Sequence, residues 1–214
     1  LCNSAKVEPP SDRSKSWSII GDPTDGAWLV AALKHGLNLQ SLHVQKPMIH
    51  LMPFSSKTKR MTTIHKFGDE ILVYTKGAPR NILSVCNRII VDGKVEDLTR
   101  EHLLSVEGKI HEFADEGLRV IAVAHKELPG NESFKDGSVE QNMIFVGLAA
   151  MKDPPRPEVK DAVKQAKQGG IKIVIITGDY GPTAQAIAEE VGIVDQGSCH
   201  IIRGVDLETI TDET

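Results

Sequence analysis

Short runs rich in apolar and β-branched residues recur through the first two thirds of the chain and predict strands. These runs are IHLMPF (49–54), MTTIHKF (61–67), EILVYTK (70–76), RVIAVAHKEL (119–128) and MIFVGLAAM (143–151). Gly68 and Asp69 separate two of the runs, which predicts a hairpin. NRIIVDGKVEDL (87–98) carries an Asp-Gly turn between apolar residues and predicts another hairpin.

Two segments of the same part have the apolar spacing of helices. DGAWLVAALKHGL (25–37) has Asp25 near its start and Gly36 near its end, and REHLLSVEGKIHEFADEGL (100–118) is amphipathic. Strands mixed with helices in this order predict an α+β domain with an antiparallel sheet and flanking helices over residues 1–148.

The pattern changes after Asp153, where Pro154 and Pro155 prevent a helix. The following runs predict a helix, a strand buried on both faces, a second helix and a second strand. They are RPEVKDAVKQAKQGG (156–170), IKIVIIT (171–177), GPTAQAIAEEVGI (181–193) and CHIIR (199–203). This order predicts an incomplete parallel α/β segment over residues 157–214, with residues 149–156 as a hinge.

Composition fits an ordinary globular protein, with 40% hydrophobic and 25% charged residues. A net charge of −4 gives no support for nucleic-acid binding. No apolar run approaches the roughly 20 residues that cross a bilayer. Three cysteines, Cys2, Cys86 and Cys199, match neither a disulfide framework nor a zinc site, which favours a reducing cytosol. The first residue is Leu1 and not Met, which indicates an excised piece.

The run IITGD (175–179) places Thr177, Gly178 and Asp179 at the carboxyl end of a predicted strand. Ligands of parallel sheets bind there, and helix N-termini favour phosphate. Thr177 is therefore a candidate donor to a phosphoryl oxygen, Gly178 allows close backbone approach, and Asp179 is a candidate contact for magnesium or a polar group. The alternative is a loop whose aspartate caps the next helix. MKDPPRPE (151–158) is similarly either a stiff linker or a hinge that places Asp153 and Arg156 beside a cleft.

GDPTDGAW (21–28) nearly copies a phosphate-binding P-loop, but Ala27 and Trp28 replace the required Lys and Ser or Thr. We therefore reject a P-loop. Thr24 and Asp25 are candidates for a helix N-cap, and the alternative for Asp25 is a carboxylate that accepts a hydrogen bond from an amino group.

LVYTKGAPRNIL (72–83) raises the question of why an apolar strand ends on Lys76 and Gly77. One interpretation is an ordinary strand-to-helix turn. The other is a pocket in which Gly77 leaves room for a flat ligand and Lys76 supplies charge.

Three further residues have both a structural and a binding interpretation. Phe54 is either a core residue or a platform for a nucleobase, where stacking is worth roughly 1–3 kcal/mol per base. Lys59 follows Phe54 in a basic run that is solvated surface by default. Arg119 either pairs with a nearby acidic residue or contacts a phosphate.

Taken in order, these motifs resemble those of P-type cation-transporting ATPases. CNSA, GDPTDGA, MPFSSKTKRM, KGAPR, GLRVIAVA, MKDPPRPE and IITGD follow one another as in that family, over essentially the whole chain. KGAP and TGD joined by DPPR are specific to the family. PFSSKTKRM and GDPTDGAWLVAA resemble the calcium-pump-like branch. The resemblance implies a nucleotide-binding domain over residues 1–148 and part of a haloacid-dehalogenase-like phosphorylation domain over residues 157–214.

The resemblance also implies roles for individual residues. Those implied at the nucleotide are Asp25 at the adenine amino group, Phe54 stacked on adenine, Lys59 and Lys76 lining the pocket, Gly77 and Ala78 at its floor, and Arg119 at the phosphates. Those implied at the hinge and near the γ-phosphate are Asp153, Arg156, Thr177, Gly178 and Asp179. Two positions depart from the family, since Arg80 stands where an acidic residue is common and Asp25 is shorter than the usual Glu.

For the full-length parent the resemblance implies transfer of the γ-phosphoryl group of ATP to an aspartate, with Mg²⁺, to drive cation transport of a calcium-like kind. The Asp-Lys-Thr-Gly-Thr and Gly-Asp-Gly-x-Asn-Asp motifs of the family do not occur in these 214 residues. The chain is therefore expected to bind ATP without turnover, as a monomeric cytoplasmic domain of an integral membrane protein. Its implied partners are the rest of the phosphorylation domain, the actuator domain and the membrane helices, with no nucleic acid.

Two other functions are considered. A haloacid-dehalogenase-type phosphatase needs an Asp-x-Asp pair after a strand, and the sequence has none. A non-catalytic interaction module that has lost nucleotide binding stays open because of Arg80 and Asp25.

Overall fold

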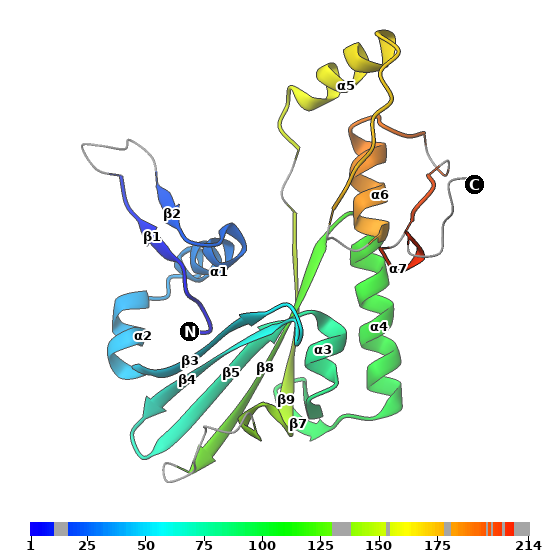
Figure 1. Cartoon of the computed structure of the whole chain (residues 1–214). Coiled ribbons are helices and arrows are strands. Elements are labelled where there is room, and N and C mark those ends of the chain that lie inside the picture. The colour runs from blue at the N-terminus through cyan, green and yellow to red at the C-terminus, as the bar shows by residue number, and fades with distance from the viewer. Residues whose placement is uncertain are drawn as a thin grey trace. The chain divides into compact units, whose positions relative to one another are not determined.

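The computed structural model describes residues 1–10, 17–129, 138–152, 155–177, 181–195, 197, 199–202 and 204–207 (Figure 1). The chain divides into two compact units. The first comprises Leu1–Thr99 and Ile121–Gly147, and the second comprises Arg100–Val120 and Leu148–Thr214. Sequence predicted the boundaries 1–148, 149–156 and 157–214, and these remain predictions for the functional domains.

A seven-stranded sheet, in the order β3-β4-β5-β8-β9-β6-β7, is the centre of the first unit. The strands are β3 (Met48–Ser55), β4 (Arg60–Phe67), β5 (Glu70–Gly77), β6 (Cys86–Val91), β7 (Lys94–Asp97), β8 (Arg119–Pro129) and β9 (Met143–Met151). The pairs β3–β4, β4–β5, β5–β8 and β6–β7 are antiparallel, and β6–β9 is parallel. The prediction of an α+β domain with a mostly antiparallel sheet is confirmed.

Both predicted hairpins form around turns of left-handed backbone. Gly68, between β4 and β5, has a φ of 60°, and Asp92 and Gly93, between β6 and β7, have φ values of 48° and 78°. Positive φ at both central residues is what a type I′ hairpin requires, because that turn matches the twist of the two strands. The Asp-Gly pair thus sets the register of β6 against β7.

Short helices and a small hairpin complete the first unit. They are β1 (Lys6–Glu8), β2 (Ser18–Ile20), α1 (Pro23–Lys34), α2 (Leu39–Gln45), α3 (Pro79–Leu83) and the 3₁₀ turn η1 (Ser138–Glu140). α1 contacts the β1–β2 hairpin and α2, whereas α3 contacts β5 and β6. The N-cap of α1 is Asp22, whose side chain accepts hydrogen bonds from the backbone N–H groups of Thr24 and Asp25. Neither Thr24 nor Asp25 is therefore the cap.

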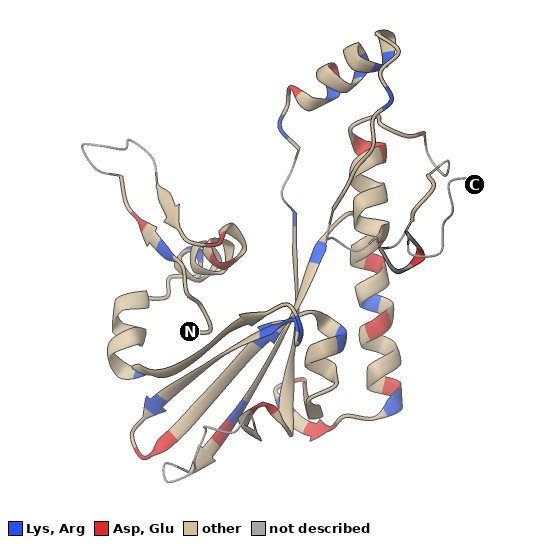
Figure 2. Cartoon of the chain, in the orientation of Figure 1, with Lys and Arg blue, Asp and Glu red and all other residues tan. Residues whose placement is uncertain are grey.

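The core of the first unit lies on both faces of the central strands. Ile64 and Val73 are fully buried, and so are Ala122 and Ala124 on the neighbouring strand. Burial on both faces explains why β4 and β5 are apolar or β-branched at consecutive positions and do not simply alternate. Charged side chains are sparse along the middle of these strands and more frequent near their ends (Figure 2).

The second unit contains α4 (Arg100–Asp115), α5 (Val159–Gln168), α6 (Gly181–Glu190) and the short α7 (Gly204–Leu207). α4 and α6 lie side by side (Figure 1). Where they meet, a Cβ on Gly117 would lie 3.1 Å from Cβ of Ala186. Thr183 Oγ1 donates a hydrogen bond of 3.4 Å to the carbonyl of Leu118. The helices predicted at 100–118, 156–170 and 181–193 are thus present.

Residues 171–177 form no strand in this structure, so the strand predicted there is wrong. The strand predicted at 199–203 is also wrong for residues 199–202, the part that the structure describes. Neither segment pairs with a strand in the described part of the chain. Ile176 is 95% exposed and Val174 is 71% exposed, although the sequence predicted burial on both faces. A strand needs a neighbour to satisfy its backbone groups, and without one the β-branched run forms no ladder.

Within the described ranges, no helix combines the length and the hydrophobicity that crossing a bilayer requires.

Candidate functional site

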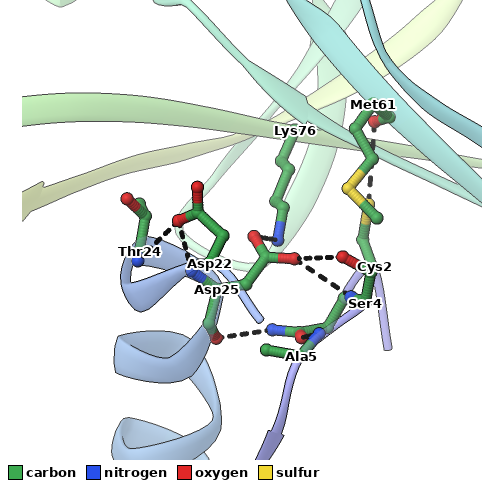
Figure 3. A network of polar contacts seen from close by, with 9 residues as sticks. Cys2, Ser4, Ala5, Asp22, Thr24, Asp25, Met61 and Lys76 are labelled. Carbon is green, nitrogen blue, oxygen red and sulfur yellow. Dashed lines mark hydrogen bonds and ion pairs between the residues drawn. The ribbon is translucent and has the colours of Figure 1, made fainter. Parts of the chain in front are cut away.

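A buried ion pair joins α1 to the sheet (Figure 3). Lys76 Nζ lies 2.6 Å from Oδ1 of Asp25, and each residue is only 7% exposed. Asp25 belongs to the first turn of α1, where a negative charge is favoured by the helix dipole. Lys76 is the penultimate residue of β5. Two residues that the sequence singled out separately, 51 positions apart, therefore lie in contact.

The N-terminal segment closes the other side of the Asp25 carboxylate (Figure 3). The backbone N–H and the hydroxyl of Ser4 each donate to Oδ2 of Asp25 at 3.0 Å. Asn3 Nδ2 donates to the Asp25 carbonyl at 2.7 Å. Cys2 Sγ lies 3.7 Å from the carbonyl oxygen of Met61 on β4, and burial raises the pKa of this thiol. The thiol therefore stays protonated and donates that contact.

Glycine is required at position 77 because the end of β5 lies very close to the backbone of the β3–β4 hairpin. A Cβ on Gly77 would collide with the carbonyl oxygen of Lys59 and would lie 2.7 Å from Cα of Arg60. The same carbonyl of Lys59 accepts a hydrogen bond of 2.9 Å from the N–H of Ala78. A backbone hydrogen bond therefore joins the KGAP turn to the β3–β4 hairpin. The two backbones lie so close that only glycine fits at position 77.

Phe54 and Lys59 lie on that hairpin and are accessible to solvent. Phe54 is 62% exposed, so it is not a core residue. Its strand is irregular here, with a register shift between Met52 and Ser55. Lys59 has a φ of 52°, in the left-handed region, and its N–H bonds the Ser55 carbonyl at 2.7 Å. Phe54 and Lys59 are therefore exposed on a hairpin whose turn is hydrogen-bonded to Ala78 through the Lys59 carbonyl.

The opposite face of the sheet holds a polar network that the sequence analysis missed. Arg60 lies 2.6 Å from Oε2 of Glu140, and Thr62 Oγ1 donates to Oε1 of Glu140 at 2.5 Å. Thr62 also shares a hydrogen bond of 2.9 Å with Thr75 on β5. Glu140 is 7% exposed. It lies 80 residues after Arg60 in the sequence, so no local pattern could have linked them.

Three rings stand in a row on the face of the sheet that carries Lys76. His65 meets Tyr74 edge to face at 5.6 Å, and Tyr74 stacks on His125 at 6.4 Å. Burial lowers the pKa of both histidines and raises the pKa of Tyr74, so all three rings are neutral at pH 7. Tyr74 and His125 line a hollow of about 400 Å³ on this face.

The remaining residues expected at the site belong to the second unit or lie outside the described residues. Arg119, Arg156 and Thr177 are described and exposed, and all three belong to the second unit. Asp153, Gly178 and Asp179 lie outside the described residues.

Potential metal-binding side chains are dispersed among the described residues. No group of three or more His, Cys, Asp or Glu side chains that could hold a metal ion occurs in the described part of the chain. Asp25 and Glu140 are each engaged by a cationic side chain. Asp179, the magnesium candidate from the sequence, lies outside the described residues.

Comparison with known proteins gives a consistent result over the whole chain. The family model for P-type ATPase, cytoplasmic domain N, matches residues 1–158. Calcium-transporting ATPase 1 of Lactococcus lactis subsp. lactis (strain IL1403) is 35% identical over 213 residues, which cover 100% of this chain and 24% of that protein. Cation-transporting ATPase pma1 of Synechocystis sp. (strain ATCC 27184 / PCC 6803 / Kazusa) is 37% identical over 212 residues, covering 98% of this chain and 23% of that protein.

The calcium-transporting ATPase of Bacillus subtilis (strain 168) is 35% identical over 214 residues, again 100% of this chain and 24% of that protein. The chain thus spans about a quarter of the length of these relatives. Because the family model covers most of the chain and the similarity extends to its end, this chain belongs to the P-type ATPases, and residues 1–158 correspond to their cytoplasmic domain N.

Proposed function

We propose that the first unit binds the nucleotide of a cation-transporting P-type ATPase. In this proposal Phe54 stacks on the base, Lys59 and Lys76 line the pocket with positive charge, and Gly77 and Ala78 form its floor. The proposal is carried by the hairpin at Phe54 and Lys59, which presents an exposed ring and an exposed cation and is hydrogen-bonded to Ala78.

The solvent exposure of Phe54 and Lys59 supports this proposal. Phe54 is 62% exposed and Lys59 is exposed as well, so both side chains are accessible to a ligand. A nucleobase offers a π-face to such a ring, worth roughly 1–3 kcal/mol, and its phosphates offer charge to lysine. The alternative assignment of Phe54 to the core does not fit this exposure.

Residues of the second unit complete the proposal on the phosphate side. Arg119 is proposed to contact the phosphates. Asp25, in the first unit, is proposed to accept a hydrogen bond from the adenine amino group. Asp153 and Arg156 are assigned to the hinge, and Thr177, Gly178 and Asp179 to the loop that meets the γ-phosphate. We assign residues 157–214 to part of a haloacid-dehalogenase-like phosphorylation domain.

The parent protein is proposed to transfer the γ-phosphoryl group of ATP to an aspartate and to couple this step to cation transport. Calcium is the proposed cation, because the Lactococcus and Bacillus relatives are named calcium-transporting ATPases. The parent is an integral membrane protein in this proposal, and this chain is one of its cytoplasmic parts. Its partners are ATP and the rest of the pump.

The chain itself is proposed to bind ATP without hydrolysing it. The family's Asp-Lys-Thr-Gly-Thr motif does not occur in the 214 residues, so the phosphoryl acceptor lies elsewhere in the parent. Magnesium would neutralise phosphate charge in the complete pump. No step assigned to the described residues runs through the metal. Neither a phosphatase nor a non-binding module is favoured over this function.

The test is ATP titration of the whole chain by calorimetry, beside two phenylalanine variants. Wild type is expected to bind with a Kd on the order of 0.1–1 mM, or about −4 to −5.5 kcal/mol. Phe54→Ala should weaken binding by about 1–3 kcal/mol. Phe67→Ala is the matched control, because Phe67 is 44% exposed and is assigned no nucleotide contact. Absence of binding by wild type at several mM ATP would refute the proposal.

A further inference from the structure

Glu140, in η1, binds the start of β4 with both of its carboxylate oxygens. Oε2 lies 2.8 Å from Nε of Arg60 and 2.6 Å from its Nη2, so two nitrogens of one guanidinium converge on this oxygen. Oε1 accepts the hydroxyl proton of Thr62. Because that hydroxyl has a single proton, Thr75 of β5 is the donor in its 2.9 Å contact with Thr62. Glu140 therefore links the start of β4 to the end of β5.

Arg60 is also the residue at which β4 leaves the turn of the β3–β4 hairpin. It follows Lys59, which has a φ of 52° and whose carbonyl accepts the Ala78 N–H at 2.9 Å. A non-glycine residue in the left-handed region is strained and persists only where its surroundings fix it. Pairing with β3 is irregular here, because the register shifts between Met52 and Ser55. The contact between Arg60 and Glu140 thus lies where the turn needs support.

The Arg60–Glu140 pair lies on the face of the sheet opposite Lys76. Side chains alternate along a strand, so Arg60 and Thr62 point away from the face that Met61 shares with Lys76. Glu140 is 7% exposed, and β4 engages both of its oxygens. Glu140 can therefore act on a ligand through the backbone of the hairpin but not by touching it.

We infer that Glu140, through Arg60, is a positioning residue of the nucleotide site and holds the end of the β3–β4 hairpin in register with the KGAP turn. That end of the hairpin carries Phe54 and Lys59. The inference rests on the nucleotide-binding function proposed above and adds to it a residue that makes no ligand contact. All of these residues belong to the first unit.

The first test separates affinity from stability by titrating each variant with ATP and unfolding it with urea. Glu140→Gln should weaken ATP binding by about three- to thirtyfold, the range typical of residues that act on a ligand without touching it. Ile89→Ala is the control, because it removes a buried side chain from β6, which β5, β8 and β9 separate from β4. This variant should lose stability and keep wild-type affinity at a temperature where it stays folded.

The double variant Arg60→Met/Glu140→Gln serves if Glu140→Gln alone does not fold. It leaves no unpaired charge, so its stability should exceed that of Glu140→Gln. The hairpin still lacks its ion pair, so ATP binding should stay at least about threefold weaker than in wild type. Recovery of wild-type affinity together with stability would overturn the inference, as would equal weakening of binding in Ile89→Ala.

A measurement without nucleotide keeps the inference distinguishable from the proposed function. The Ala78 amide, which donates to the Lys59 carbonyl, should exchange with solvent at least about tenfold faster in the double variant than in wild type or Ile89→Ala. NMR measures this exchange, and unchanged protection of Ala78 would overturn the positioning role. If wild type binds no ATP, the proposed function fails, and the Ala78 amide alone decides whether Glu140 holds the hairpin.

Discussion

Lys76 and Asp25 form a buried ion pair, with Nζ 2.6 Å from Oδ1 and only 9% of each side chain exposed. Lys109 and Glu112 on α4 form an ion pair of the same length, but 59% and 53% of these side chains are exposed. The two pairs therefore differ in burial and not in geometry. This contrast allows the contribution of burial to be measured within one chain.

Removing one partner of the buried pair should be strongly destabilising. Asp25→Ala or Lys76→Ala leaves a charge buried without its partner and is expected to cost about 3–5 kcal/mol of unfolding free energy. Lys109→Ala, on the exposed pair, should cost less than about 1 kcal/mol. Urea denaturation at pH 7 measures all three. Equal losses at the buried and exposed pairs would contradict the prediction.

Gly77→Ala should destabilise the first unit by about 1–3 kcal/mol, because the new Cβ is forced into the backbone of Lys59 and Arg60. Gly108→Ala is the matched control. Gly108 lies within α4 with nothing within 4 Å of a Cβ, so the change should stabilise by about 0.5–1 kcal/mol. Thermal unfolding of the two variants should therefore shift in opposite directions. A neutral Gly77→Ala would mean that the two strands separate at little cost.

Glu140 should couple energetically to Arg60 across 80 residues of sequence. Glu140→Gln leaves the Arg60 guanidinium without its carboxylate and is expected to cost about 2–4 kcal/mol. Arg60→Met added to Glu140→Gln should cost less than the sum of the single changes, with a coupling of about 0.5–3 kcal/mol. A double-mutant cycle by urea denaturation measures this coupling. Additive single effects would show that the contact contributes nothing.

Stability should fall as the pH falls below about 6.5. Burial lowers the pKa of His65, whose Nε2 is buried without a hydrogen-bond partner among the described residues. Between the lowered folded pKa and the unfolded value, the unfolded chain takes up a proton that the folded chain does not, so acidification favours unfolding. Urea midpoints at pH 7.5, 6.5 and 5.5 measure the slope. His65→Gln should flatten it, and an unchanged slope would exclude His65 as the cause.

Amides of residues 171–177 should exchange faster with solvent than those of β4 and β5. The segment has no paired strand in the described part of the chain, and Ile176 is 95% exposed. Amides without ladder partners exchange through low-energy openings, whereas those of buried strands require larger unfolding. Hydrogen exchange followed by mass spectrometry compares the segments directly. Equal protection would mean that residues 171–177 are paired in solution.

Local chemistry allowed most elements to be predicted from the sequence. The Asp-Gly pair at 92–93 sets a hairpin because it accepts left-handed backbone, and the apolar spacing of α1 and α4 is the spacing of one helix face. The prediction of a strand over 171–177 was wrong because β-branched residues only favour extended backbone. A strand also needs a neighbouring strand to hydrogen-bond with.

For the candidate site, the sequence by itself determined which residue types are present, including Phe54 and the KGAP turn, and the order of its motifs indicated the family. Only the tertiary structure decided their partners. It pairs Lys76 with Asp25, fits Gly77 against Lys59 and joins Arg60 to Glu140. The physical reason is that buried charges and close backbone contacts depend on segments far apart in the chain, and hydrophobic periodicity carries no information about which of them meet.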